Sequence, residues 1–256
     1  MIPYFELRTL PIAGGLSLAV FGTLVALGVF AGVLFAESRA RTVGIPARNL
    51  HVAIAWVLVP GFALAHVVAL LPHVHHAPDW STSILPQFWN GMSSFGGFLG
   101  AFLGLAFHYR RTRASWLVLA EVLVQALVVG WVFGRLGCTL VHDHVGRPST
   151  FWLAIRFPGG PRHDLGFYEL LYTMLVLLPA VVVLNRRVRK PGTTICWIAL
   201  LYAPARFLAD FLRATDLPGA DPRYLGLTLA QYGCVALACV GLAAARHIRQ
   251  QVERRA

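Results

Sequence analysis

Residues 116–133 read WLVLAEVLVQALVVGWVF, an apolar run with one charged residue, Glu121. The run approaches the roughly 20 residues that an α-helix needs to cross the hydrocarbon core of a bilayer. A spanning helix satisfies its own backbone hydrogen bonds, which lipid cannot do. This stretch therefore predicts a transmembrane helix.

Six further apolar runs lie on either side of it. Hydrophobic residues make up 57% of the 256-residue chain and charged residues only 13%, whereas soluble domains carry about 25% charged residues. The composition predicts an all-α, polytopic integral membrane protein, with residues 1–256 forming a single transmembrane domain. The expected spans, about seven in number, are 14–36, 50–71, 91–107, 116–133, 167–184, 193–212 and 226–245.

Basic residues follow the first, third, fifth and seventh runs, which places them on one side of a seven-span chain. The positive-inside rule makes that side the cytoplasm, with the N-terminus outside and the C-terminus inside. The formal net charge is +11, but basic clusters beside apolar runs are typical of anionic headgroups rather than of nucleic acid. The clusters are Arg39, Arg41, Arg48; Arg110, Arg111, Arg113; Arg186, Arg187, Arg189, Lys190; and Arg246, Arg249, Arg254, Arg255.

Two outside segments are informative. Segment 72–90 has no Lys or Arg, whereas 134–166 has four arginines that break the charge bias and need another reason to be there. We therefore expect 134–166 to be a periplasmic segment that carries a site. Three histidines in the first segment form no metal-binding pattern of fixed geometry, and no metal is expected at His73, His75 and His76.

The most specific stretch is GRLGCTLVHDHVG, residues 134–146. Its glycines allow tight turns and close approach to a ligand, and Arg135 supplies a planar charged fork suited to phosphate. A snorkelling arginine in an interfacial loop is the alternative. An Asp between two histidines favours a site, and the candidate residues are Gly134, Arg135, Gly137, Cys138, His142, Asp143, His144 and Gly146.

Arg206, Asp210 and Arg213 have the i, i+4, i+7 spacing that puts side chains on one helix face. Ionisable residues within a span usually face a cavity or a partner. The alternative is an internal Arg206–Asp210 pair with Arg213 at the headgroups, which still leaves one side of Arg206 for phosphate. Glu121, inside the fourth span, requires a buried partner or a polar cavity. A structural role, in which it bonds to a neighbouring helix, explains its position at least as well as a catalytic role.

A third group, His163, Tyr168 and Glu169, opens the fifth span. Glu169 in a first helical turn also suits the helix dipole.

In these motifs the chain resembles the prolipoprotein diacylglyceryl transferase family. The family pattern GRxGNFxNxExxG corresponds to residues 134–146, RHPxQLYE to the segment RHDLGFYE at 162–169, and LGLTMGQ to LGLTLAQ at 225–231. The departures are equally specific. The histidine of the family's SFHGG segment is replaced by Phe95, before Gly96 and Gly97, while Cys138 and Asp143 replace the signature Asn and Glu.

The resemblance implies a bacterial inner-membrane enzyme that transfers the diacylglyceryl group of phosphatidylglycerol to the thiol of a lipobox cysteine in a prolipoprotein. It implies no cofactor, because phosphate is already the leaving group. Arg135 and Arg206 would then stabilise the phosphate, and another group must replace the absent histidine as base. His142 is our preferred base, with His144 and His163 as alternatives, and Asp143 would orient one of them.

The same resemblance assigns substrate contacts to residues of every motif. They are Gly96, Gly97, Gly134, Gly137, Cys138, His144, Gly146, His163, Tyr168, Glu169 and Asp210. The expected partners are phosphatidylglycerol, the lipobox peptide and membrane lipids, with no nucleic acid. A non-catalytic lipid- or lipoprotein-binding paralogue is the alternative, favoured by Phe95. A small transporter is less favoured, because no inverted repeat is evident.

Overall fold

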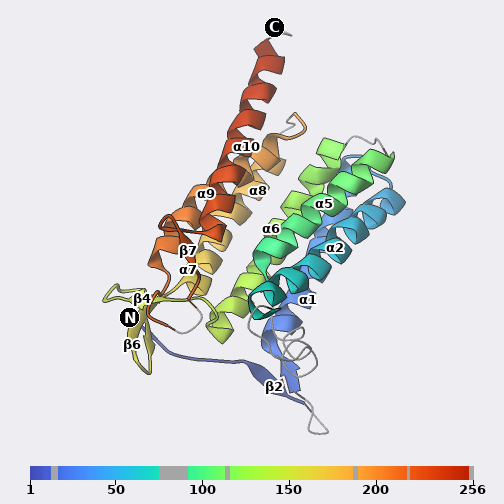
Figure 1. Ribbon diagram of the computed structural model, residues 1–256. Coiled ribbons are helices and arrows are strands. Elements are labelled where there is room, and N and C mark those ends of the chain that lie inside the picture. The colour runs from blue at the N-terminus through green and yellow to red at the C-terminus, as the bar shows by residue number, and fades with distance from the viewer. Residues whose placement is uncertain (13–16, 75–91, 113–115, 187–189, 218–219, 254–256) are drawn as a thin grey trace. The chain divides into compact units, whose positions relative to one another are not determined.

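The computed structural model describes residues 1–12, 17–74, 92–112, 116–186, 190–217 and 220–253, and most of them are helical (Figure 1). Among these described residues, six helical stretches are long and apolar enough to cross a membrane. The chain is therefore a multi-pass membrane protein, as its composition predicts. The six stretches are Val20–Thr42, Ala47–Leu70, Trp116–Val141, Leu165–Asn185, Thr193–Leu212 and Leu229–Gln250.

The expected count of seven spans is not confirmed. The expected span 91–107 corresponds to helix α5 (Ser94–Thr112), which is not among the six candidate stretches. This helix carries Arg110 and Arg111 in its last turn. Most of the outside segment 72–90, including His75 and His76, lies beyond the described residues.

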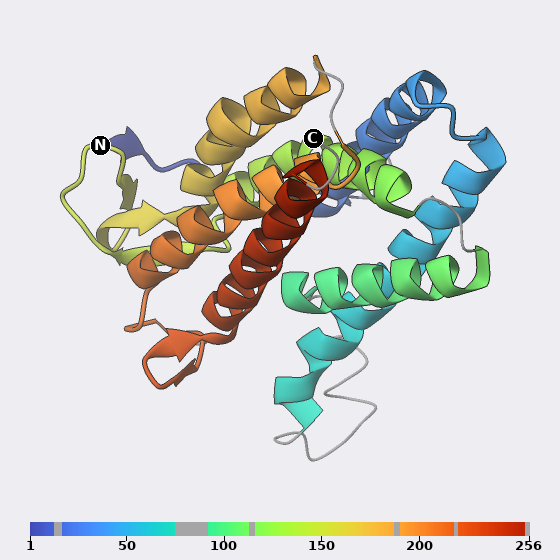
Figure 2. The same cartoon turned by 90° about the horizontal axis from the view of Figure 1, so that it is seen from above.

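The chain divides into two compact units, of which residues 39–119 form the smaller. Within it, α2 (Ala47–Val74) and α5 pack against each other and cross (Figure 2). A Cβ on Gly100 or Gly104 would fall 2.1 Å from the Pro60 carbonyl oxygen or 1.7 Å from that of Trp56. These glycines therefore serve the close helix packing that their four-residue spacing predicts.

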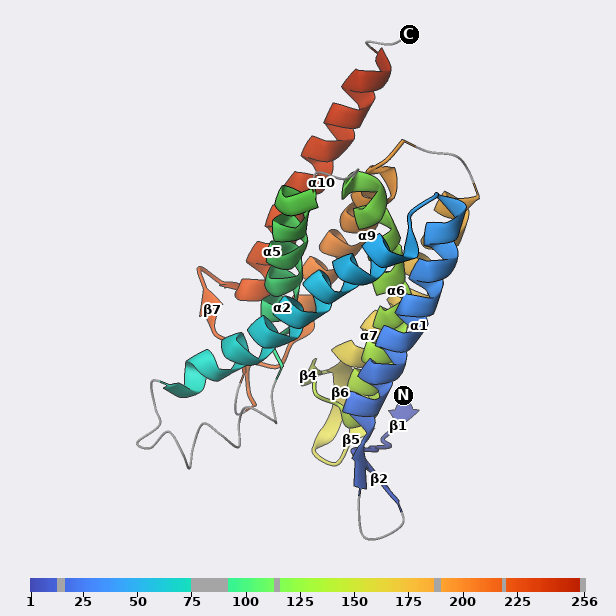
Figure 3. The same ribbon diagram turned by 90° about the vertical axis from the view of Figure 1, so that its right-hand side faces the viewer.

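In the larger unit, residues 1–38 and 120–256, α1 (Val20–Thr42) lies beside α6 (Trp116–Val141), as Figure 3 shows. A Cβ on Gly130 would lie 2.8 Å from the carbonyl oxygen of Gly28. Helix α9 (Thr193–Ala209) packs against α10 (Leu229–Glu253). Glu121 Oε1 accepts a hydrogen bond of 2.7 Å from the Thr194 amide, so Glu121 joins α6 to a neighbouring helix.

The fifth span is built from three consecutive helical pieces. Helix α7 (Leu165–Tyr172) continues into a π-helical turn, η2 (Thr173–Leu177), and then into α8 (Leu178–Asn185). The carboxylate of Asp164 caps α7 by accepting the Phe167 amide at 2.8 Å. Leu177, Val181, Val128 and Ile198 form a buried cluster that holds these pieces against α6 and α9.

An all-α fold is correct for the spans but not for the segments between them. Strands β1 (Ile2–Pro3), β5 (Ile155–Phe157), β6 (Gly160–Asp164) and β4 (Val145–Pro148) form one sheet in that order. Two small hairpins pair β2 (Thr9–Pro11) with β3 (Ser17–Ala19) and β7 (Arg223–Tyr224) with β8 (Leu227–Thr228). The strands are short, and an apolar-run criterion does not detect them.

Two helix boundaries also differ from the prediction. The first span starts at Val20 rather than at residue 14, because Ser17–Ala19 pairs as a strand. The fourth continues from Phe133 to Val141, so Gly134 and Gly137 are helical and make no turn. The turn comes at His142, whose φ of 51° is left-handed and ends the helix.

Candidate active site

The polar site of the larger unit is centred on Glu169. Its Oε2 lies 2.8 Å from Arg135 Nη2, and its Oε1 lies 3.2 Å from Arg206 Nη1. These three side chains come from α7, α6 and α9, and each is at most 8% exposed. One carboxylate on a short helix thus joins two arginines on two different helices.

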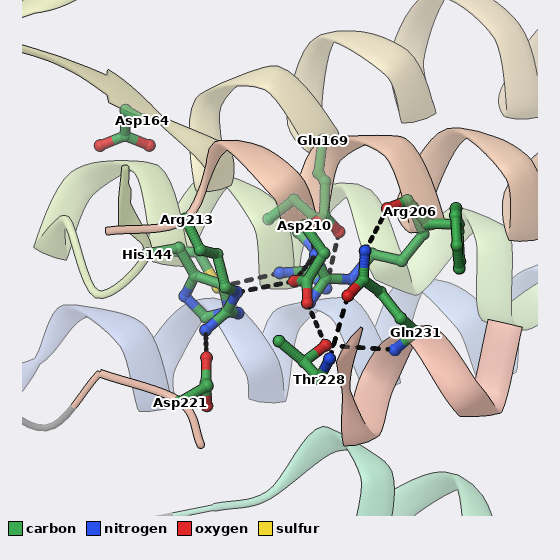
Figure 4. Close-up of polar contacts among 12 residues, drawn as sticks. His144, Asp164, Glu169, Arg206, Asp210, Arg213, Asp221, Thr228 and Gln231 are labelled. Carbon is green, nitrogen blue, oxygen red and sulfur yellow. Dashed lines mark hydrogen bonds and ion pairs between the residues drawn. The ribbon is translucent and has the colours of Figure 1, made fainter. Parts of the chain in front are cut away.

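Asp210 extends this network at the C-terminal end of α9, where the 3₁₀ turn η3 (Asp210–Leu212) begins (Figure 4). Its Oδ1 lies 2.9 Å from Arg206 Nη1 and 2.8 Å from Arg213 Nε. The Thr228 hydroxyl donates to Oδ2, and Arg223 donates to the Asp210 carbonyl at 3.2 Å. The Arg206–Asp210 pair expected from helical spacing is confirmed.

The charges of this cluster nearly balance. Three guanidinium groups face two buried carboxylates, those of Glu169 and Asp210, and the third arginine, Arg213, also pairs with Asp221. Glu169 and Asp210 reach these arginines from other turns and helices.

A cavity of about 200 Å³ opens beside the Glu169–Arg206 pair. Three tyrosines, Tyr168, Tyr172 and Tyr202, line it together with these two residues. Arg135 is not among the residues that line it but pairs with Glu169, which does. Arg206 is therefore the arginine placed to meet a ligand in the cavity.

The ring of His142 is held on both sides. Its Nδ1 lies 2.6 Å from Asp164 Oδ2, its Nε2 lies 3.0 Å from the Phe5 carbonyl oxygen, and Tyr4 stacks on it at 4.9 Å. Burial lowers the pKa of His142, but the hydrogen bond to Asp164 and the charge of that carboxylate outweigh it and raise the pKa. His142 therefore fastens the N-terminal segment to the sheet, a role that sequence reasoning did not foresee.

His144 and Asp143 form a separate pair. Their Nδ1 and Oδ1 atoms lie 2.5 Å apart. Burial raises the pKa of Asp143, but the hydrogen bond to His144 and the nearby cations outweigh it and lower the pKa. The pair lies close to Cys138, one turn before the end of α6.

His163 on β6 is not among the residues that line the cavity, but its Nδ1 lies 2.8 Å from the hydroxyl of Tyr168, which is. Burial and, next, the positive charge of Arg147 lower the pKa of His163. The ring is therefore neutral at pH 7 and able to accept a proton.

Three of the predicted site glycines, Gly96, Gly137 and Gly146, lie in close packing contacts. A Cβ on Gly146 would lie 2.6 Å from the Leu212 carbonyl oxygen, and one on Gly137 would lie 3.0 Å from the Phe21 ring. Gly134 has open space around it. Gly96 and Gly97 belong to the smaller unit, where Gly96 packs against the Leu64 carbonyl oxygen.

Sequence reasoning gave no role to Asp164, Thr228 and Gln231. Gln231 Oε1 accepts the Thr228 amide at 2.9 Å and its Nε2 donates to the Phe207 carbonyl at 3.0 Å. Thr228 and Gln231 stand in the LGLTLAQ segment, which contributed to the resemblance. The sequence signal that could have identified Thr228 and Gln231 is their position as polar residues at the start of an apolar run.

Comparison with known proteins identifies the family. The family model described as prolipoprotein diacylglyceryl transferase matches residues 9–246. The chain belongs to this family. The match includes every residue of the Arg135–Glu169–Arg206–Asp210 network.

Curated relatives in the family are named phosphatidylglycerol–prolipoprotein diacylglyceryl transferase. One from Nitratidesulfovibrio vulgaris (strain Miyazaki F) is 32% identical over 160 residues, 61% of this chain and 60% of the relative. One from Polynucleobacter asymbioticus is 30% identical over 214 residues, 80% of this chain and 79% of the relative. A third, from Clostridium tetani, is 22% identical over 219 residues, 82% of this chain and 84% of the relative.

Proposed function

We propose that the protein transfers the diacylglyceryl group of phosphatidylglycerol to the thiol of a lipobox cysteine in a prolipoprotein and releases glycerol phosphate. Its family and the names of its relatives support this reaction. The observation that carries the proposal is the cavity bounded by Arg206 and Glu169, because it places a buried guanidinium where a lipid phosphate can bind.

The charge change of the reaction suits an arginine. The thiolate sulfur attacks the carbon of the diacylated glycerol that is bonded to the phosphate oxygen. An S–C bond forms there, and the bond between that carbon and the phosphate oxygen breaks. The electron pair leaves with the phosphate, whose charge grows from one to two negative units. Arg206 therefore binds the departing group more strongly than the substrate, which is the condition for lowering the barrier.

Arg135 acts on this site through Glu169. Without Arg135, the Glu169 carboxylate would oppose a phosphate in the cavity. With Arg135 Nη2 at 2.8 Å, the carboxylate is neutralised and also holds Arg206 in place. Arg135 is in this account a positioning residue, whereas Arg206 touches substrate.

The thiol proton requires an acceptor, and His163 is the best placed. Its ring is neutral at pH 7 and bonded to Tyr168, which lines the cavity. His142, our preferred base from the sequence, uses both ring nitrogens in contacts with Asp164 and Phe5. His163 would take the proton from the thiol and return it to water after transfer.

The orientation follows from the charge pattern. We place the chain in the bacterial inner membrane with seven spans, the N-terminus and the segment 134–166 outside, and the C-terminus in the cytoplasm. The basic linkers support this arrangement. This arrangement puts His163, within the segment 134–166, on the side where prolipoproteins are exposed.

The reaction is tested with purified protein in vesicles of headgroup-labelled phosphatidylglycerol. A lipobox peptide with cysteine should release soluble glycerol phosphate, and the same peptide with serine should not. Arg206→Ala should abolish release, whereas Arg156→Ala, which changes an exposed side chain on β5, should retain it. Equal release with both peptides, or none from the wild type, would overturn the proposal.

A further inference from the structure

Three potential metal ligands meet where α6 ends. The Cys138 sulfur, an Asp143 carboxylate oxygen and a His144 ring nitrogen all lie within 4.8 Å of one another. Neither the transfer reaction nor the Arg206 network uses these three groups. From the sequence we expected no metal.

The backbone conformation at the end of α6 brings these three side chains together. His142 has a left-handed φ of 51°, which reverses the chain and brings Asp143 and His144 back over the last turn of α6. The His142 ring is fixed by Asp164 and by the Phe5 carbonyl. The turn is thus held from two sides by segments distant in sequence.

Further contacts fix the ligands' own backbone. The Leu165 amide donates to the His144 carbonyl at 2.9 Å. A Cβ on Gly166 would lie 3.0 Å from the Cys138 carbonyl carbon, so the start of α7 packs directly on that residue. Ligands whose backbone is fixed lose little freedom on binding, which favours a preformed site.

We propose that Cys138, Asp143 and His144 bind a divalent cation that accepts both sulfur and nitrogen ligands, with Zn²⁺ as the best match. Thiolate, imidazole and carboxylate together are the ligand set of zinc, whereas Mg²⁺ and Ca²⁺ require several oxygens. Three protein ligands leave the fourth tetrahedral position for water or another small ligand.

The geometry needs only small side-chain movements. Zinc holds sulfur at about 2.3 Å and nitrogen or oxygen at about 2.0–2.2 Å, so ligand atoms end about 3.5 Å apart. The cluster is already within 4.8 Å. The Asp143–His144 hydrogen bond of 2.5 Å must open, and the metal takes its place.

The surrounding charges and exposure are compatible with a cation. Arg135 Nη1 lies 3.8 Å from the Cys138 sulfur, and Glu169 neutralises the charge of this arginine. Asp143 has a 38% exposed side chain, which gives the metal a path from water. Binding displaces the thiol proton, so affinity should increase with pH.

Metal titration of tag-free, detergent-solubilised protein tests the site without any activity readout. Zn²⁺ should bind with a stoichiometry of one, and Co²⁺ should give a thiolate-to-cobalt absorption band. Cys138→Ser should abolish that band, and His144→Ala should weaken Zn²⁺ binding by more than about tenfold, since even loss of an outer-shell partner costs that much. Cys239→Ser, which changes an exposed cysteine, should bind like the wild type.

A second measurement covers variants that fail to fold. In the wild-type protein, Zn²⁺ should raise the melting temperature in detergent, because the ion binds the folded state, and an equal concentration of Mg²⁺ should not. Absence of a cobalt–thiolate band, unchanged binding in Cys138→Ser and His144→Ala, or the same melting temperature with and without Zn²⁺ would each overturn the proposal. None of these outcomes depends on diacylglyceryl transfer.

Discussion

Arg135 Nη2 lies 2.8 Å from Glu169 Oε2, and both side chains are buried. The pair joins the signature helix α6 to the short helix α7 that opens the fifth span. A buried carboxylate that loses its charge leaves its cationic partners uncompensated. This relationship therefore determines both the stability of the site and the orientation of Arg206.

Glu169→Gln should destabilise the protein by about 3–5 kcal/mol, because it leaves Arg135 and Arg206 buried without their shared counter-ion. Thermal unfolding in detergent measures the change. Asp216→Asn is the control, since it removes a carboxylate from a surface pair with Arg162 and should leave the melting temperature unchanged. Equal effects of the two substitutions would show that the buried network is not what holds these helices.

The His142–Asp164 contact should make stability depend on pH. Because the pKa of His142 is raised in the folded protein, the contact is fully stabilising below the ordinary pKa of 6.5 and is lost as pH rises through the raised value. The melting-temperature difference between wild type and His142→Gln should therefore be largest near pH 5 and shrink toward pH 8. His163 titrates in both proteins, so its contribution to the pH dependence cancels in this difference. A gap that stays constant over the range contradicts the assignment.

Among the three histidines of the outer segment, His163 should matter most for rate. His163→Ala should lower transfer by about 10²–10⁴-fold, the usual contribution of a general base, and should leave phosphatidylglycerol binding intact. His144→Ala should transfer at the wild-type rate. His142→Ala should lower the melting temperature, while the protein that remains folded should still transfer. The wild-type rate should rise with pH through a pKa below 6.5, because burial and Arg147 lower that of His163. Full activity in His163→Ala removes it as the base.

Features of the fold and the site that depend on residues close together in the sequence could be predicted, whereas those that depend on distant residues could not. Six of the seven predicted spans correspond to helices of spanning length, and Arg206–Asp210 follows from a four-residue spacing on one helix. Both are local properties. Arg135–Glu169 and His142–Asp164 are not, because they depend on which helix faces meet after packing.

The extent of α6 illustrates a second limit. Glycines at 134 and 137 suggested turns, but both are helical, and the chain turns instead at His142. Packing against α1 at Gly137 compensates for the poor helix propensity of glycine. Sequence alone does not reveal that compensation.

The proposed orientation is tested by cysteine accessibility in a Cys239→Ser background. Thr150→Cys, in the outer segment, should react with a membrane-impermeant maleimide added outside intact cells. Arg189→Cys, in a basic linker beyond the described residues, should react only after the membrane is permeabilised. Labelling of the second variant from outside would reverse the orientation.

The mass of the acceptor peptide decides whether this chain is an active transferase with Arg206 at the lipid phosphate. The lipobox peptide should gain one diacylglyceryl group on its cysteine when wild-type protein is present in phosphatidylglycerol vesicles. Arg206→Lys should lower the rate by about 10²–10³-fold, as loss of a transition-state donor does, since lysine lacks the bidentate fork. An unmodified peptide with folded wild-type protein would show that the chain is not an active transferase, and full transfer by Arg206→Lys and Arg206→Ala would show that Arg206 does not act on the phosphate.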